Sequence, residues 1–167
     1  MNFPPWLVEI YKLAQKGDAD HQFNVGNILY EGGTGVTKDT HLAVMWLHKA
    51  AVQGHAEAQY KLGKCFAEGN GGYPGQTLRE DLVEAVNWYG KAARQGHTLA
   101  LLHLGECYAE GKGLEADRVE AFAYLKLACK NTEKARDNLN AIRRTMTPNE
   151  IKSGQTRAKE IRAGFLK

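Results

Sequence analysis

Residues 46–63 read Trp46-Leu47-His48-Lys49-Ala50-Ala51-Val52-Gln53-Gly54-His55-Ala56-Glu57-Ala58-Gln59-Tyr60-Lys61-Leu62-Gly63. Ala50 and Ala51 form a small-residue face near the end of one helix, and Gly54 permits the left-handed turn that ends it. An amphipathic pattern resumes directly after that turn. The stretch therefore predicts a tight helix hairpin, and the segments on either side of it can be aligned with parts of it.

Three series of glycines recur together along the chain, and each repeats after 37 and then 42 residues. They are Gly17, Gly54 and Gly96; Gly26, Gly63 and Gly105; and Gly32, Gly69 and Gly111. Such regular spacing is typical of repeat proteins. A glycine in mid-helix costs about 1 kcal/mol relative to alanine, so the second series needs a packing reason. We expect a close helix crossing at Gly63 and its equivalents.

Three aspartates mark the expected start of the second helix in each unit. Asp39, Asp81 and Asp117 each stand seven residues before an aromatic side chain. An aspartate at this position can accept hydrogen bonds from the first free amides of a helix. Glu84 and Glu120 follow three residues after two of them, where a capping-box partner belongs. Each unit is thus predicted to be helix, loop, helix.

The repeated motifs resemble those of the Sel-1-like repeat family. They are Ala58-Gln59-Tyr60-x-Leu62-Gly63, the Gly-x-Gly-Leu at residues 111–114, and Trp88-Tyr89-x-Lys91-Ala92-Ala93-x-Gln95-Gly96. The resemblance implies an all-α fold, a right-handed α/α solenoid of helix-turn-helix repeats related to tetratricopeptide arrays. It also implies an adaptor in protein assembly, and it implies no catalytic residues.

The expected organisation is a single solenoid domain over residues 1–167. Residues 1–17 form an N-terminal capping helix, with Trp6, Ile10 and Leu13 on its apolar side. Three repeats follow at 18–54, 55–96 and 97–130. A basic pair of capping helices at 131–167 closes the array, because terminal repeats of a solenoid must cover the last apolar face. Asn131 is the expected cap of the first of these helices, and the Thr147-Pro148-Asn149-Glu150 box starts the second.

Composition and charge describe an ordinary globular chain with an uneven charge distribution. Residues 130–167 carry 10 Lys and Arg against 4 Asp and Glu, whereas residues 1–129 carry 12 against 15. No run approaches the roughly 18 apolar residues of a membrane span. The first residues lack the basic flank and apolar core of a signal peptide, so we expect a cytoplasmic protein. The three cysteines have no paired or zinc-binding spacing, which predicts buried free thiols.

The sequence predicts no catalytic, cofactor or metal site. Cys107 and His103 are four residues apart, but Cys107 aligns with Cys65 and Ile28, which favours a core position. The histidines, including His55 and His97 at two expected helix starts, offer no convergent set of three or four ligands and are interpreted as solvated. We therefore predict no enzyme, no cofactor and no nucleic-acid partner.

The expected function is protein or peptide binding in a concave groove made by the first helices of the repeats. Superposition on tetratricopeptide geometry places ten residues in that groove: Phe23, Asn27, Tyr30, Glu31, Tyr60, Lys64, Glu68, Leu102, Glu106 and Glu110. The alternative that Phe23, Tyr60 and Leu102 belong to the core stays open. Tyr73 and Pro74, in the enlarged loop of the second repeat, are a candidate further contact.

The acidic residues Glu31, Glu68 and Glu110 occupy one slot in successive repeats and predict attraction of a basic segment. That segment belongs either to a partner or to the terminal helix of another copy, through Arg157, Lys159, Arg162 and Lys167, as a weak self-association. Two other functions stay open. One is a bacterial immunity or antitoxin protein that neutralises a single partner. The other is a β-lactam-binding or β-lactam-hydrolysing enzyme like cysteine-rich secreted relatives of the repeat, although this chain lacks their paired cysteines.

Overall fold

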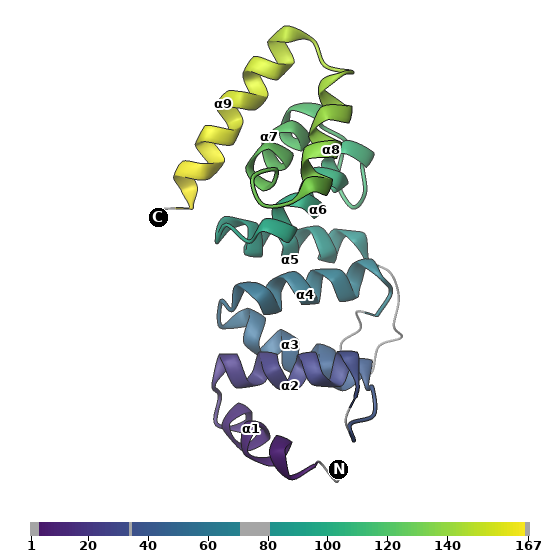
Figure 1. Cartoon of the computed structure of the whole chain (residues 1–167), viewed down its shortest axis with the longest axis vertical. Helices are drawn as coiled ribbons and strands as arrows, with labels where there is room; N and C mark the ends of the chain where they lie inside the picture. The colour runs from purple at the N-terminus through teal and green to yellow at the C-terminus, as the bar shows by residue number, and fades with distance from the viewer. Residues whose placement is uncertain (1–3, 34, 71–80, 166–167) are drawn as a thin grey trace. The chain divides into compact units, whose positions relative to one another are not determined.

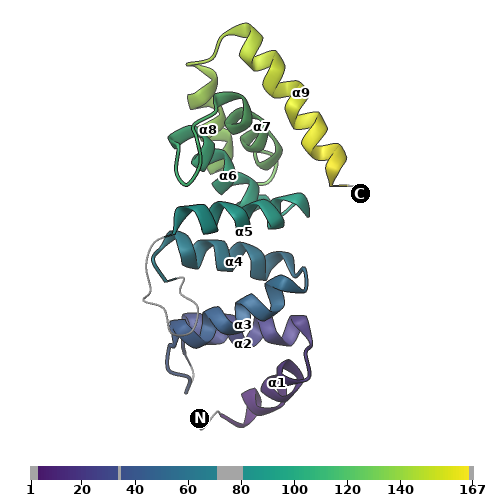
Figure 2. The ribbon, with the colours of Figure 1, turned by 180° about the vertical axis from the view of Figure 1, so that it is seen from behind.

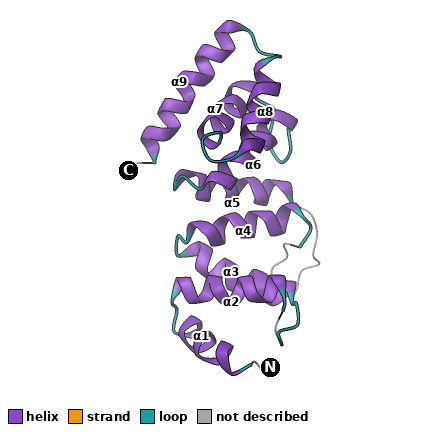
Figure 3. Cartoon of the chain, in the orientation of Figure 1, coloured by secondary structure: helices purple, strands orange, loops and turns teal. Residues whose placement is uncertain are grey.

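A computed structural model describes residues 4–33, 35–70 and 81–165 of the chain. Helices and short loops account for these residues, apart from one isolated bridge pair of Gly33 and Val36 (Figure 3). The described helices are α1 (Pro5–Gln15), α2 (Ala19–Glu31), α3 (Thr40–Val52), α4 (Ala56–Ala67), α5 (Leu82–Arg94), α6 (Thr98–Glu110), α7 (Arg118–Ala128), α8 (Glu133–Arg143) and α9 (Pro148–Gly164). They fall into two compact units, Met1–Asp81 and Leu82–Lys167. The all-helical class predicted from the sequence is confirmed.

In the first unit, α2 packs against both α1 and α3, and α3 packs against α4 (Figures 1 and 2). The core of this unit contains fully buried aliphatic side chains from all four helices, including Leu7, Val25, Leu47 and Leu62. On α1 the buried residues are Leu7 and Ala14, whereas Trp6 is 47% exposed. The predicted apolar side of this helix was therefore displaced by one residue. The helix has no equivalent in the repeats against which its register could be checked.

In the second unit, α7 is the central helix, and it packs against α6, α8 and α9. The remaining helix, α5, packs against α6. Gly154 of α9 is buried against Phe122 of α7, and a Cβ at this glycine would lie 2.6 Å from the ring. The start of α9 has the predicted capping box of Thr147 and Glu150. The terminal helix thus packs directly on the third helix pair.

Two of the three mid-helix glycines lie at close helix crossings, as the glycine series predicts. A Cβ at Gly26 would lie 2.9 Å from Cγ and 3.0 Å from the backbone nitrogen of Leu47 on α3. The same atom at Gly105 would lie 2.6 Å from Cγ of Leu125 on α7. The backbones approach so closely that no side chain fits between them. The turn glycines Gly17, Gly54 and Gly96 all have positive φ, which confirms the left-handed turn after α1, α3 and α5.

Helix starts agree with the sequence at some positions and correct it at others. Asp39 and Asp117 accept the expected hydrogen bonds from backbone amides. Glu120 does not close a box with Asp117, because the Asp117 amide donates to the Tyr108 carbonyl oxygen at 2.9 Å, and Glu120 Oε1 accepts instead from Arg157 Nε. Asn131 is not the cap of α8. Thr132 holds that position without a side-chain bond, and Asn131 instead donates to Thr98 Oγ1.

The interpretation of the histidines at two helix starts as solvated side chains is wrong. His55 and His97 are the N-caps of α4 and α6, and the Nδ1 of each ring accepts a hydrogen bond from a backbone amide three residues later. The ring therefore serves the purpose that an aspartate serves at Asp18 of α2. The recurrence of histidine at equivalent positions was the available signal. It was missed because histidine is not among the preferred capping residues.

Candidate protein-binding surface

In the first unit, side chains of α2 and α4 meet directly, so the first helices of two successive repeats share one face. The ring of Phe23 stacks on that of His55, with 4.6 Å between centroids. Asp20 lies 3.4 Å from Nε2 of the same histidine. Lys61 of α4 lies 3.2 Å from the carboxylate of Glu31 on α2. We call this face, with its predicted residues Phe23, Asn27, Glu31, Lys64 and Glu68, the α2–α4 face.

A buried tyrosine stabilises one end of the α2–α4 face. The hydroxyl of Tyr30 donates to Glu68 Oε2 at 2.6 Å, and Glu68 also lies 3.5 Å from Lys64. Burial raises the pKa of Tyr30 far above its ordinary value, and the hydrogen bond to Glu68 raises it further. Tyr30 therefore remains a hydroxyl donor at any physiological pH and holds α4 against α2.

Three of the ten predicted groove residues are buried. Tyr30 and Tyr60 are each 8% exposed, and Leu102 is 3% exposed. For Tyr60 and Leu102 this burial favours the alternative that they belong to the core. Tyr30, which was expected only in the groove, is equally buried, and we leave all three out of the surface described below. Phe23 is half-buried under its stacked histidine. Tyr73 and Pro74 lie outside the described residues.

In the second unit, Glu106 connects α6 to α8. Its carboxylate accepts hydrogen bonds from Asn138 Nδ2 at 3.0 Å and lies 2.8 Å from Lys134 Nζ. His103 Nδ1 lies 3.0 Å from the other carboxylate oxygen. Burial by itself would raise the pKa of Glu106, but the bonds and charges of His103 and Lys134 outweigh it and lower the pKa to about 2. The carboxylate is therefore ionised and held in one position.

A hollow of about 330 Å³ lies beside Glu106, between side chains of α6, α7 and α8. Its apolar lining includes Leu125 and Ile142, and Glu110 also lines it. Two of the predicted groove residues, Glu106 and Glu110, are therefore brought together around one concavity. We call it the α6–α8 hollow. An apolar lining with a few fixed polar groups is the usual composition of a binding concavity.

Each predicted acidic residue has a lysine of the same chain beside it. Glu31 pairs with Lys61 at 3.2 Å, Glu68 with Lys64 at 3.5 Å, and Glu110 with Lys112 at 2.6 Å. These ion pairs neutralise much of the negative potential that a basic segment would need. The sequence could not indicate the partner of Glu31, which is 30 residues away, whereas Lys64 and Lys112 lie within four residues of Glu68 and Glu110 and were overlooked. That the three acids form one row across both units stays a prediction.

Two of the three thiols, one in each unit, are buried. Burial raises the pKa of Cys65 to about 12 and that of Cys107 to about 11, so both remain protonated and unreactive. His103 Nδ1, four residues before Cys107, lies 3.0 Å from Glu106 Oε2. Cys129 is half-exposed, which corrects the expectation that all three thiols are buried. Within the described residues, no group of three or more His, Cys, Asp or Glu is arranged to hold a metal ion.

Comparison with known proteins identifies the repeat. The family model of the Sel1 repeat matches residues 19–55, 56–97 and 98–133, which together make up more than half of the chain. The chain belongs to the Sel1 repeat family. The three matched Sel1 repeats cover α2 to α7, and the second and third begin at Ala56 and Thr98, the first residues of α4 and α6.

Two solved structures of Sel1 repeat proteins resemble the chain. A Sel1 repeat protein from Oxalobacter formigenes is 30% identical, with a TM-score of 0.68 over 81% of this chain and 97% of that one. A protective antigen present in uropathogenic Escherichia coli strains, which displays an SLR fold, is 25% identical with a TM-score of 0.69. That match covers 95% of this chain but only 41% of the antigen. No curated protein matches the chain in sequence. The fold is the helical solenoid of Sel1 repeat proteins, which generally mediate protein–protein interactions.

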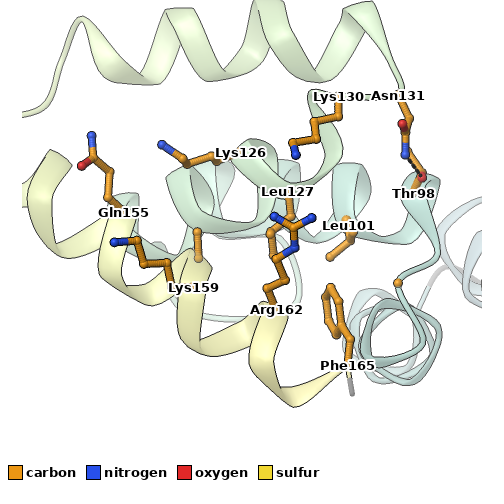
Figure 4. A pocket seen from close by; sticks show the side chains of 12 residues that line it. Thr98, Leu101, Lys126, Leu127, Lys130, Asn131, Gln155, Lys159, Arg162 and Phe165 are labelled. Carbon is orange, nitrogen blue, oxygen red and sulfur yellow. Dashed lines mark hydrogen bonds between the residues drawn. The ribbon is translucent and has the colours of Figure 1, made fainter. Parts of the chain in front are cut away.

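Among the described helices, none has both the length and the apolar character needed to cross a membrane. A second hollow of the Leu82–Lys167 unit lies on α6, α7 and α9 (Figure 4). Lys159 and Arg162 line it, and both belong to the basic terminal segment noted in the sequence. The excess of Lys and Arg in residues 130–167 indicated a basic surface, but the spacing of these residues gave no reason to expect a pocket there.

Proposed function

We propose that this Sel1 repeat protein is a non-catalytic scaffold that binds a partner protein through the α2–α4 face and the α6–α8 hollow. One observation carries the proposal. The mid-helix glycine recurs in every repeat and lies at a close crossing in two of them, whereas the next residue changes from Asn27 to Lys64 to Glu106. The glycine is thus constant, while the side chain beside it is neutral, positive or negative in successive repeats. A repeat protein that recognises a particular partner needs this combination.

The ion pairs of the surface favour a partner of mixed charge. A purely basic segment would have to displace Lys61 and Lys64 from Glu31 and Glu68, so its charge would add little affinity. Phe23, stacked on His55, offers a half-buried aromatic contact beside these charges. Aromatic residues dominate the energetics of many protein interfaces. We therefore propose that the partner presents an apolar side chain to Phe23 and both signs of charge around it.

The three unpaired cysteines support a cytoplasmic site of action, because free thiols persist in a reducing compartment. An immunity or antitoxin protein would be one form of this scaffold, with a single partner to neutralise. A β-lactam-hydrolysing enzyme is not proposed. Burial raises the pKa values of the Cys65 and Cys107 thiols, so both stay protonated at neutral pH.

Site-directed photo-crosslinking in the native source tests the proposal. A photoreactive residue placed at position 27 or 64 is expected to capture one and the same partner. The matched control is position 41, where His41 is exposed on the second helix α3. Phe23→Ala should then weaken binding of the captured partner at least tenfold, about 1.4 kcal/mol. Equal capture from position 41, or no capture from either test position, would exclude the α2–α4 face.

A further inference from the structure

The hollow on α6, α7 and α9 has an apolar side and a basic side. Its volume is about 320 Å³, and it lies wholly within the Leu82–Lys167 unit. The apolar side includes Leu101 of α6, Leu127 of α7 and Phe165 directly after α9. Figure 4 shows Leu101 and Phe165 close together at one end, where the bond from Asn131 to Thr98 also lies. We call this hollow the basic pocket.

Four cationic side chains line the basic pocket, namely Lys126, Lys130, Lys159 and Arg162. No aspartate or glutamate is among its lining residues. In Figure 4 the side chains of Lys130 and Arg162 extend toward one another across the opening. Like charges held together without an anion repel each other, and a bound anion relieves that repulsion. The pocket is therefore complementary to negative charge.

The cations of the pocket differ from the neighbouring arginine on the same helix. Arg157 of α9 is neutralised by Glu120 and Glu160. Within the described residues, Lys130, Lys159 and Arg162 form no ion pair with a carboxylate. Lys126 lies over the Phe122 ring, with 5.6 Å from Nζ to the centroid. The helix thus uses one cation to attach itself to α7 and leaves two others available at the pocket.

The floor of the pocket departs from the pattern of the other repeats. Gln22 and Gln59 occupy equivalent positions and donate to a backbone carbonyl eight residues earlier, of Ala14 and Ala51 respectively. The third repeat has Leu101 at this position, and Leu101 lines the pocket. A polar structural contact is therefore absent from the repeat that carries the pocket. An apolar surface takes its place.

We infer that the basic pocket binds an acidic segment of a partner protein, with one apolar side chain against Leu101, Leu127 and Phe165. Carboxylates beside that side chain would bind Lys130, Lys159 and Arg162. An arginine can hold a carboxylate through two parallel hydrogen bonds, which fixes the orientation of the segment. This inference rests on the proposed function as a protein-binding scaffold and adds to it a second contact that selects negative charge.

The shape of the pocket favours a peptide over other anions. Its volume is at the small end of the range for ligand sites, and matches one or two side chains rather than a long acyl chain. A free phosphate would use the cations and leave the apolar side unused. An acidic peptide with an apolar residue uses both. The carboxylates of such a peptide are ionised at neutral pH, so they match the permanent charges of the pocket.

A display selection tests the inference with the full chain immobilised and a library of random octapeptides as the probe. We expect enrichment of peptides in which aspartate or glutamate flanks one large apolar residue. Lys130→Glu combined with Arg162→Glu should weaken binding of the enriched peptides at least tenfold at low salt. The matched control is Arg143→Glu combined with Lys152→Glu, at two exposed positions outside the pocket, and it should retain binding within twofold. Circular dichroism of both variants establishes that they fold.

A third variant separates the apolar side from the charges. Leu127→Gln keeps every cation of the pocket, and we expect it to weaken binding of the acidic peptides about fivefold or more. Enrichment of basic peptides, no enrichment, or equal loss in the pocket and control variants would overturn the inference. So would binding of laurate or inorganic phosphate at the pocket without any acidic peptide. Crosslinking from positions 27 and 64 is measured independently, so the scaffold proposal can stand while the pocket proposal fails.

Discussion

At the scale of a single residue, the absence of a side chain at Gly105 allows α6 and α7 to pack closely against each other. A Cβ at this position would lie 2.6 Å from Leu125 Cγ and 3.2 Å from the Leu125 backbone nitrogen. Leu125 cannot withdraw, because the nitrogen belongs to the backbone of α7 and its side chain is 1% exposed. The glycine therefore sets the distance between the two helices of the third repeat.

Gly105→Ala should lower the free energy of unfolding by about 1–2 kcal/mol. Overpacking costs about 1–3 kcal/mol, and the better helix propensity of alanine returns up to about 1 kcal/mol. Gly90 is the matched control, because it also lies in mid-helix and a Cβ there would meet only a nitrogen of Arg94 at 3.8 Å. Gly90→Ala should be neutral or stabilising. Urea denaturation of both variants measures the difference, and equal losses would contradict the packing argument.

The carboxylate of Glu106 predicts a dependence of stability on pH. Its pKa is lowered from 4.5 to about 2 in the folded chain, so the ionised form stabilises the fold. This stabilisation is fully present above about pH 4.5 and is lost as the pH falls toward 2. Glu106→Gln should therefore reduce stability by about 1–2 kcal/mol at pH 7, and the deficit should shrink below pH 4.5.

Glu110→Gln on the same helix is the control for this pH dependence. Glu110 is exposed and pairs with Lys112 at the surface, so its removal should cost less than about 1 kcal/mol. Denaturation curves of the wild type and both variants from pH 3 to 7 give the comparison. A deficit of Glu106→Gln that stays constant over this range would mean that its charge does not stabilise the fold.

At the scale of helices, the start of α9 depends on a local signal that the sequence displays in full. Thr147 Oγ1 accepts from the amide of Glu150, and the Glu150 carboxylate accepts from the amide of Thr147. Thr147→Ala should cost about 1 kcal/mol. Thr132 holds the same position on α8 but makes no side-chain capping bond, so Thr132→Ala should change stability by only a few tenths of a kcal/mol. Thermal unfolding of the two variants measures this difference in stability. Similar losses of stability would exclude a specific role for the capping box.

The helices also mark which features a single sequence can predict. The class, the turn glycines and the caps at Asp39, Asp117 and Thr147 depend on residues within a few positions of each other, and they were predicted. The bond from Arg157 to Glu120 joins residues 37 apart, and the stack of Phe23 on His55 joins residues 32 apart. Nothing in one sequence identifies such pairs. For the same reason, the groove residues Tyr30, Tyr60 and Leu102 could not be separated from the core by their spacing alone.

At the scale of the whole chain, the division into two compact units has an energetic consequence. Contacts of Gly26 with Leu47 lie inside the first unit, and contacts of Gly105 with Leu125 lie inside the second. In repeat proteins, stability is roughly a sum of local terms between neighbours. We therefore expect damage at one crossing to raise local opening first in its own unit. A fully cooperative domain would distribute the same loss over every helix.

Hydrogen exchange of two matched variants tests this expectation. Gly26→Ala should speed amide exchange in α2 and α3 at least fivefold and leave α6 and α7 within twofold of the wild type. Gly105→Ala should give the reverse, because each substitution introduces the same methyl group at the equivalent crossing. Both variants need to be measured under conditions where the chain remains folded, so that exchange reports local opening rather than global unfolding. Uniform acceleration across all four helices in both variants would show that the two units open as one cooperative body.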